Sequence, residues 1–179
     1  MSSLTLFTAL VMLVAVERLA ELVVSHRNAE WSMRHGGVEF GRRHYPFMVG
    51  LHTSLLAGVL LEVWTRRPDF VAPLGWTMLV VVLASQFLRW WCILALGPRW
   101  NTRVIVVPGL ALVRSGPYRW LRHPNYVAVV AEGLALPLVH SAWMSAVAFT
   151  VLNAGLLTVR VRVENEALDN TEPTAHEVA

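Results

Sequence analysis

Residues 122 to 126 read Arg-His-Pro-Asn-Tyr, which places a cation, an imidazole and a phenol around a proline that can begin a helix. Proline is favoured in the first turn of a helix, so we expect His123 just before a helix and Tyr126 within its first turn. A helix start exposes free N–H groups and the positive end of the helix dipole. A carboxylate or phosphate of a cofactor could bind there. The alternative is that Arg122 and His123 only reach lipid headgroups.

A second polar cluster runs from Arg160 to Glu166, at the end of the last apolar segment. Arg160 and Glu164 are four residues apart, so their side chains share one face of a helix. If that face is solvated, they form a weak surface ion pair. If it belongs to a site, Glu164 or Asn165 can bind the hydroxyl groups of a cofactor sugar while Arg160 fixes the carboxylate. The spacing alone leaves both interpretations open.

The composition indicates that these clusters belong to a membrane protein. Of the 179 residues, 55% are hydrophobic, which exceeds the usual share in a soluble domain. No Gly/Ser-rich linker or low-complexity run divides the chain. We therefore expect a single domain over residues 1–168, followed by a flexible polar tail over residues 169–179.

Several classes of function are disfavoured by the residue types. The basic residues are all Arg and are spread over loops rather than gathered on one soluble face, so no nucleic-acid partner is expected. The single cysteine, Cys92, excludes an internal disulfide and a cysteine-based zinc site. The spacing of His26, His35 and His44 matches no zinc pattern, so no metal site is predicted.

Five apolar segments can be drawn along the chain. A helix needs about 20 apolar residues to span a bilayer, and all but the fourth segment meet this length. The fourth is short and contains Glu132 and Pro137, so it could start within the membrane interface or pair with the fifth as a tight helical hairpin. The sequence thus predicts an all-α integral membrane protein with about five transmembrane helices. The segments are Leu4–Val24, Pro46–Trp64, Leu74–Leu96, Asn125–Val139 and Ala142–Val163.

The placement of arginine predicts the orientation in the membrane. Most arginines fall in two long loops, Ser25–Tyr45 and Gly97–Pro124. Cytoplasmic loops carry an excess of basic residues, so we place both loops and the C-terminus in the cytoplasm and the N-terminus outside. Glycine–proline pairs punctuate the second loop, which indicates an ordered cofactor-binding loop with a short extended run at Val104–Val107.

The first apolar segment contains Glu17, Arg18 and Glu21. Charges within a membrane are costly and usually pair with one another or face a polar cavity. Arg18 and Glu21 are close enough along a helix to pair. A partner such as Arg89 could complete a clamp between helices; alternatively, the charges could line a polar pocket.

The block GPYRWLRHPNY at residues 116–126, together with RVRVENEAL at residues 160–168, resembles the isoprenylcysteine carboxyl methyltransferase family. Its members are integral-membrane enzymes that use S-adenosylmethionine. The resemblance covers about residues 15–168. Its upstream part is similar to a bacterial branch that includes O-methyltransferases of long-chain alkylpyrones, which implies a multi-pass protein of the bacterial inner membrane. The upstream blocks lie at residues 17–21, 25–31, 36–41, 44–45 and 51–52.

The resemblance also implies roles for individual residues. Arg122 or Arg160 would lie beside the acceptor anion or the cofactor carboxylate, and we assign both, with Glu164, to the catalytic group. Family members often have paired glutamates, whereas this chain has Glu-Asn-Glu at residues 164–166. The residues implied in binding S-adenosylmethionine, whose product is S-adenosylhomocysteine, are Tyr118, His123, Tyr126, Glu164 and Asn165.

The predicted function is therefore O-methylation of a lipophilic acceptor at the cytoplasmic membrane face. The acceptor would be a prenylcysteine-type carboxylate or a long-chain polyketide such as an alkylpyrone. We expect Glu39, His44 and His52 to contribute to acceptor binding. The alternatives are a phospholipid N-methyltransferase, a non-catalytic membrane scaffold, and an NADPH-dependent sterol-type reductase. The reductases carry a similar loop, but their C-terminal Lys-Tyr-Gly signature is absent from this chain.

Overall fold

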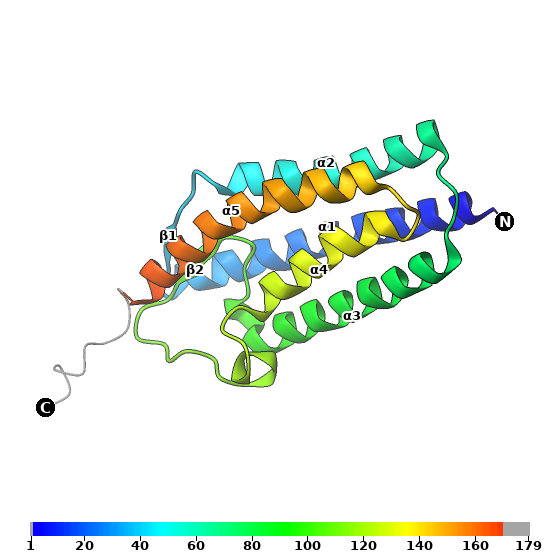
Figure 1. Cartoon of the computed structure of the whole chain (residues 1–179). Coiled ribbons are helices and arrows are strands. Elements are labelled where there is room, and N and C mark those ends of the chain that lie inside the picture. Colours follow the sequence, from blue (N-terminus) through cyan, green and yellow to red (C-terminus); the bar gives the residue numbers. More distant parts are fainter. Residues whose placement is uncertain (1, 170–179) are drawn as a thin grey trace, which may run out of the picture.

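The apolar segments fold as five helices in the computed structural model, which describes residues 2–169 (Figure 1). The predicted all-α architecture is confirmed, and α4 is the shortest helix, as expected. Prolines stand at the starts of α2, α3 and α4, where the missing N–H costs no helical hydrogen bond. The expected tail beyond Asp169 lies outside the described residues. The helices are α1 (Ser3–Arg34), α2 (Tyr45–Arg66), α3 (Ala72–Leu96), α4 (Pro124–Leu138) and α5 (Trp143–Asp169).

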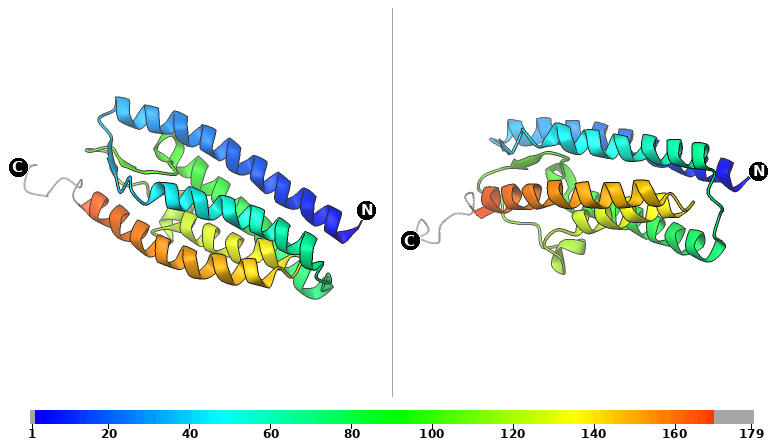
Figure 2. Two further views of the ribbon diagram at one scale, coloured as in Figure 1. Left: turned by 90° about the horizontal axis from the view of Figure 1, so that it is seen from above. Right: turned by 45° about the horizontal axis from the view of Figure 1, so that its top comes forward.

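The helix axes are roughly aligned, and the helices form a bundle (Figures 1 and 2). The N-terminus and the α2–α3 and α4–α5 turns lie at one end of the bundle. The long loops after α1 and α3, together with the end of α5, lie at the other. Helix α4 packs between α3 and α5, and α2 packs against α5. This topology brings the two polar clusters of the sequence to the same end of the molecule.

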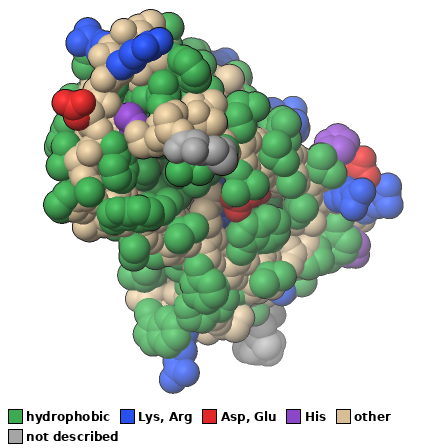
Figure 3. All heavy atoms as spheres, turned by 90° about the vertical axis from the view of Figure 1, so that its right-hand side faces the viewer, with side chains coloured by type: hydrophobic (Ala, Val, Ile, Leu, Met, Phe, Trp, Pro, Cys, Tyr) green, Lys and Arg blue, Asp and Glu red, His purple; other side chains and the backbone are tan. Residues whose placement is uncertain are grey.

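Among residues 2–169, three helices are long and apolar enough to cross a membrane: α2, α5, and α3 with the turn that follows it. Their outward faces carry large apolar side chains, including Phe87 and Leu94 on α3 and Val151 on α5. Hydrophobic side chains also cover much of the surface seen in the space-filling view of Figure 3. An apolar exterior of this extent is suited to lipid rather than to water, and this chain is a membrane protein.

The apolar core lies toward the end of the bundle that carries the N-terminus. Val11 of α1, Val59 of α2 and Leu136 of α4 are fully buried in it. Gly133 of α4 faces the ring of Phe149 on α5, where an added Cβ would lie 1.9 Å from Phe149 Cε1. Only glycine therefore allows α4 and α5 to approach this closely.

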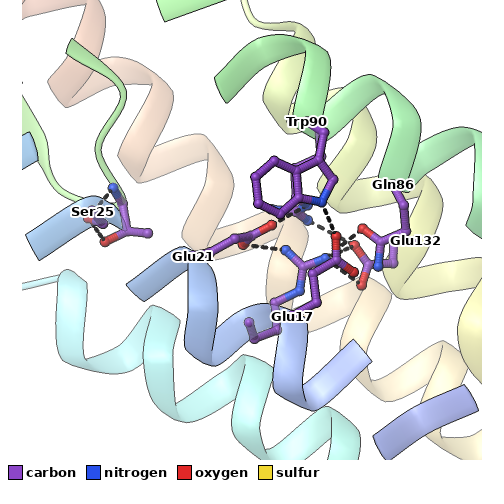
Figure 4. Close-up of polar contacts among 9 residues, drawn as sticks. Glu17, Glu21, Ser25, Gln86, Trp90 and Glu132 are labelled. Atoms are coloured by element: carbon purple, nitrogen blue, oxygen red, sulfur yellow. Dashed lines mark hydrogen bonds and ion pairs between the residues drawn. The ribbon is translucent and has the colours of Figure 1, made fainter. Parts of the chain in front are cut away.

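Charged side chains join α1, α3 and α4 inside the bundle (Figure 4). Arg18 donates to Glu21 at 2.5 Å and to Gln86 at 2.8 Å. Both Arg18 and Arg89 donate to Glu132 Oε2 at 2.9 Å. The expected clamp involving Arg89 is confirmed, with Glu132 at its centre. These residues do not contribute to the lining of the cavity described below.

A small antiparallel ribbon connects the two long loops. Strand β1 (Val38–Phe40) pairs with β2 (Val104–Val106), with Glu39 opposite Ile105. The extended run in the second loop is confirmed, whereas its partner strand was not anticipated. Gly41, which follows β1, has φ +61°, and an added Cβ there would lie 2.3 Å from the His44 ring. Glycine is therefore required where the chain turns from the ribbon into α2.

Candidate functional site

A cavity of about 690 Å³ opens at the end of the bundle that carries the long loops. Its walls come from the end of α1, the loop between α3 and α4, the start of α4 and the end of α5. The volume falls within the range of small-molecule sites. Glu164 is the single acidic residue among the described residues that line it. The lining arginines are Arg99, Arg103, Arg114, Arg119, Arg122 and Arg160.

The two polar clusters meet at Tyr126. Its hydroxyl donates a short hydrogen bond to Glu164 Oε2 and accepts one from Arg160 Nε at 2.9 Å. Tyr126 is in the first turn of α4 because Pro124 begins that helix. Arg160 and Glu164 reach the same phenol because they are one turn apart on α5. Arg160 thus links to Glu164 through the Tyr126 phenol.

His123 lies beside this group, at the N-cap of α4 as expected. Its ring stacks on Tyr126 with 5.3 Å between the ring centroids. Its Nε2 is 3.1 Å from Asn165 Oδ1, and its Nδ1 is 3.3 Å from Glu164 Oε1. The sequence prediction that these residues converge agrees with this geometry.

Tyr118 and Arg122 border the cavity at different depths. Burial raises the pKa of Tyr118 far above its ordinary value, with a further contribution from the nearby Cys92 thiol. Tyr118 therefore presents a neutral phenol at physiological pH. Arg122 is exposed and lies 3.5 Å from Asp169 Oδ1 at the rim. Arg160, by contrast, is buried.

Thr102 holds Arg160 in place, a role that sequence reasoning missed. The Thr102 carbonyl accepts a hydrogen bond from Arg160 Nη1 at 2.6 Å. The Thr102 hydroxyl lies 2.7 Å from Ser25 Oγ and 3.2 Å from Tyr45 OH. Thr102 therefore connects α1, α2 and α5. A threonine outside any motif carries no sequence signal for such a position.

Three further lining residues have buried polar atoms without a hydrogen-bond partner among the described residues. They are the indole nitrogen of Trp100 and the amide oxygens of Asn101 and Asn125. Buried polar groups are nearly always satisfied, and leaving one unpaired costs about 1–3 kcal/mol. These atoms are therefore available to form hydrogen bonds with a polar molecule that enters the cavity.

The residues expected to bind the acceptor lie elsewhere. Glu39 on β1 is 3.1 Å from Arg42 Nε and 3.8 Å from Arg103 Nη1. His44 precedes α2, and burial together with the positive charge of Arg160 lowers its pKa, so this imidazole is neutral at physiological pH. His52 is inside the bundle, where its Nδ1 is 2.8 Å from the Met48 carbonyl oxygen. None of Glu39, His44 and His52 is among the described residues that line the cavity.

Comparisons with known proteins find a family and two relatives. The family model of the isoprenylcysteine carboxyl methyltransferase (ICMT) family matches residues 76–170, which include both polar clusters. The chain is 37% identical over 165 residues to YpbQ of Bacillus subtilis (strain 168), described as an uncharacterized protein, covering 91% of this chain and 96% of that one. It is 23% identical over 125 residues to an uncharacterized protein of Haemophilus influenzae, covering 68% and 71% of the two chains. No solved structure matches the chain significantly.

These matches establish the family: the chain belongs to the isoprenylcysteine carboxyl methyltransferase family. Family membership, together with three helices able to span a bilayer, suggests a membrane methyltransferase. The methyltransferases of this family generally use S-adenosylmethionine.

Proposed function

We propose that this protein is an S-adenosylmethionine-dependent O-methyltransferase that acts on a lipophilic acceptor at the cytoplasmic face of the bacterial inner membrane. The observation that carries the proposal is the junction of Tyr126, Arg160 and Glu164 at the wall of a ligand-sized cavity. The side of the membrane rests on the positions of the arginines along the chain.

The lining fits this cofactor in its chemistry. Glu164 in the lining offers oxygens that can accept hydrogen bonds from ribose hydroxyls, and Asn165 contacts His123 beside it. Trp100 and Asn125 offer unpaired polar atoms, and the lining arginines can bind a carboxylate. Tyr118, His123 and Tyr126 add ring surfaces and hydrogen-bonding groups. When bound, S-adenosylmethionine supplies a methyl group activated by its sulfonium.

The chain's own task is to hold the acceptor. A carboxylate, with an ordinary pKa near ~3.5, is ionised at neutral pH, so the site requires no strong general base. Arg122 at the rim or Arg160 inside would orient the acceptor oxygen for displacement. An arginine that bound it too tightly would weaken its nucleophilicity. The excess of lining arginines favours an anionic oxygen acceptor over an ammonium group.

The lipid part of the acceptor requires apolar surface. Leu96, Val106, Leu110 and Leu112 supply it on the cavity wall. Because the cavity lies at the end of the spanning helices, a lipid tail could remain in the bilayer while its polar end reaches Arg160. Prenylcysteine carboxylates and the acidic enols of alkylpyrones both have this form.

The cofactor part of the proposal is tested by isothermal titration calorimetry on the full chain in detergent. Glu164→Gln removes the carboxylate that contacts Tyr126, so we expect at least about tenfold weaker binding of S-adenosylmethionine. Glu166→Gln is the matched control, because Glu166 is exposed two residues away on the same helix. Equal affinity in wild type and Glu164→Gln would contradict the assigned pocket.

The acceptor is tested with S-adenosylmethionine labelled in its methyl group. The full chain is incubated with prenylated cysteine, alkylpyrones, alkylresorcinols or phosphatidylethanolamine, and the lipid extract is analysed for label. Label on a carboxylate or enol oxygen supports the proposal, whereas label on the ethanolamine nitrogen would support phospholipid N-methylation instead. Replacing Glu39 or His52 by Ala should alter acceptor use more than cofactor affinity.

A further inference from the structure

The segment from residue 110 to residue 122, here called the interfacial segment, combines basic and apolar side chains on an exposed surface. From Gly97 to Ala131 the chain has five arginines and no acidic residue. Arg114, Arg119 and Arg122, which belong to the interfacial segment, are all exposed. This surface is therefore positively charged along its whole length.

Large apolar side chains alternate with these arginines. Trp120 is 68% exposed, and Leu110, Leu112 and Leu121 are each a little over 40% exposed. Water alone would not favour such a surface, because exposed apolar area of this kind normally marks a contact site. The mixture of indole, leucine and arginine is typical of residues at the boundary between lipid and water.

The structure holds the interfacial segment beside a membrane-spanning helix. Trp120 contacts Trp91 of α3 with 5.9 Å between ring centroids, and Arg99 donates to the Ala111 carbonyl oxygen at 2.6 Å. Gly116 has φ +56°, and a Cβ at this position would lie 3.0 Å from Trp91 Nε1. The segment is thus packed against the end of α3, a helix long and apolar enough to span a bilayer.

The arginine charges are mostly uncompensated by the protein. Arg122 lies 3.5 Å from Asp169 Oδ1, whereas Arg114 and Arg119 form no ion pair with any residue between positions 2 and 169. Guanidinium groups form strong bidentate contacts with phosphate oxygens. Each basic residue near an anionic bilayer strengthens binding by about fivefold.

We propose that the interfacial segment is a binding surface for the headgroups of anionic phospholipids. In this arrangement, Trp120 and the leucines enter the leaflet while Arg114 and Arg119 contact phosphate groups. The inference does not require methyl transfer, although Arg114, Arg119 and Trp120 also line the cavity. The same segment also forms part of the cavity wall, so lipid contact and the candidate site share one structural support.

The test uses the full chain in a neutral detergent, titrated with a short-chain phosphatidylglycerol and followed by calorimetry and thermal unfolding. Wild type should bind this lipid and gain thermal stability, with a clearly weaker response to the matching phosphatidylcholine. The double variant Arg114→Gln/Arg119→Gln should bind phosphatidylglycerol more weakly, by on the order of tenfold or more. Trp120→Ala should weaken binding of both lipids.

The matched control is Arg66→Gln/Arg67→Gln, an exposed arginine pair at the opposite end of the bundle that is followed closely by Asp69. It should bind phosphatidylglycerol about as well as wild type. Equal losses in the two double variants, equal binding of the two lipids, or equally tight binding of glycerol phosphate would each overturn the proposal. Neither measurement requires S-adenosylmethionine. The lipid-binding result can therefore be obtained even if the proposed methyltransferase function is wrong.

Discussion

At the scale of single residues, the site depends on one phenol placed between a buried cation and a carboxylate. The Tyr126 hydroxyl accepts a hydrogen bond from Arg160 and donates one to Glu164. Removing one partner of such a buried group leaves the others unpaired, which costs more than the hydrogen bond itself contributed. The three side chains therefore behave as a unit, and single substitutions within them should have non-additive effects.

Thr102 offers a test of how Arg160 is held. Thr102→Val removes the hydroxyl that contacts Ser25 and Tyr45 but keeps a branched side chain of similar volume. We expect a loss of about 1–2 kcal/mol in stability and severalfold weaker binding of S-adenosylmethionine, measured by thermal unfolding and calorimetry. Thr102→Ser retains the hydroxyl and should keep most of the wild-type stability and cofactor affinity. If Thr102→Val binds the cofactor like wild type, Thr102 does not position the site.

The residues of the site were predictable to different degrees. His123, Tyr126 and Glu164 belong to recognisable blocks, and their convergence was anticipated. Thr102 contributes a backbone carbonyl, and Asn101 contributes a buried amide oxygen. A single sequence does not reveal which loop residues are placed in this way. Glu39 and His52 do not line the cavity themselves, although Glu39 lies near the lining residue Arg103, and their role in acceptor binding stays a prediction.

At the scale of elements, the hydrophobic segments predicted all five helices because apolar length is a strong signal. The sequence carries no comparable signal that a side chain of one helix caps the start of another. Glu62 on α2 accepts hydrogen bonds from the backbone N–H groups of Met144 and Ser145, and from the Ser145 hydroxyl, at the start of α5. A carboxylate at a helix start also interacts favourably with the helix dipole. Glu62 therefore caps a helix that begins 80 or more residues later in the chain.

Glu62→Ala should lower the stability of the bundle and leave the site intact. We expect a loss of about 1–2 kcal/mol, or roughly 2–8 °C in melting temperature, measured by thermal unfolding in detergent. S-adenosylmethionine affinity at low temperature should stay close to the wild-type value, because Glu62 lies at the other end of the bundle. Glu30→Ala is the control, since the ion pairs of Glu30 with His26 and Arg34 are exposed and contribute little.

At the scale of the whole molecule, the polar clamp inside the bundle determines how α1 is attached. Arg18 and Arg89 converge on Glu132, so three helices share one buried carboxylate. The cost of charges in a membrane made pairing predictable from Arg18 and Glu21. The central position of Glu132 was not predictable, because it depends on how α4 is rotated between α3 and α5.

Glu132→Gln should be strongly destabilising, since it removes the negative charge shared by the buried Arg89 guanidinium and the partly buried Arg18 guanidinium. We expect a loss of about 3–5 kcal/mol and a fall of roughly 10 °C in melting temperature. Glu17→Gln is the comparison, because Glu17 is only half-buried and accepts its hydrogen bond from Trp90. Similar melting temperatures for the two variants would show that Glu132 does not anchor the clamp.

The β1–β2 ribbon has a consequence for how this protein could be divided. The region matched by the family model begins within α3, yet one strand of the ribbon precedes α2, and Ser25 of α1 supports Thr102. A fragment made of the matched region alone would lack strand β1. It would also lack Ser25, which contacts Thr102, the residue whose carbonyl binds Arg160. The segment that is recognisable as the family is therefore not a self-sufficient module, and transplanting it would require carrying the first two helices with it.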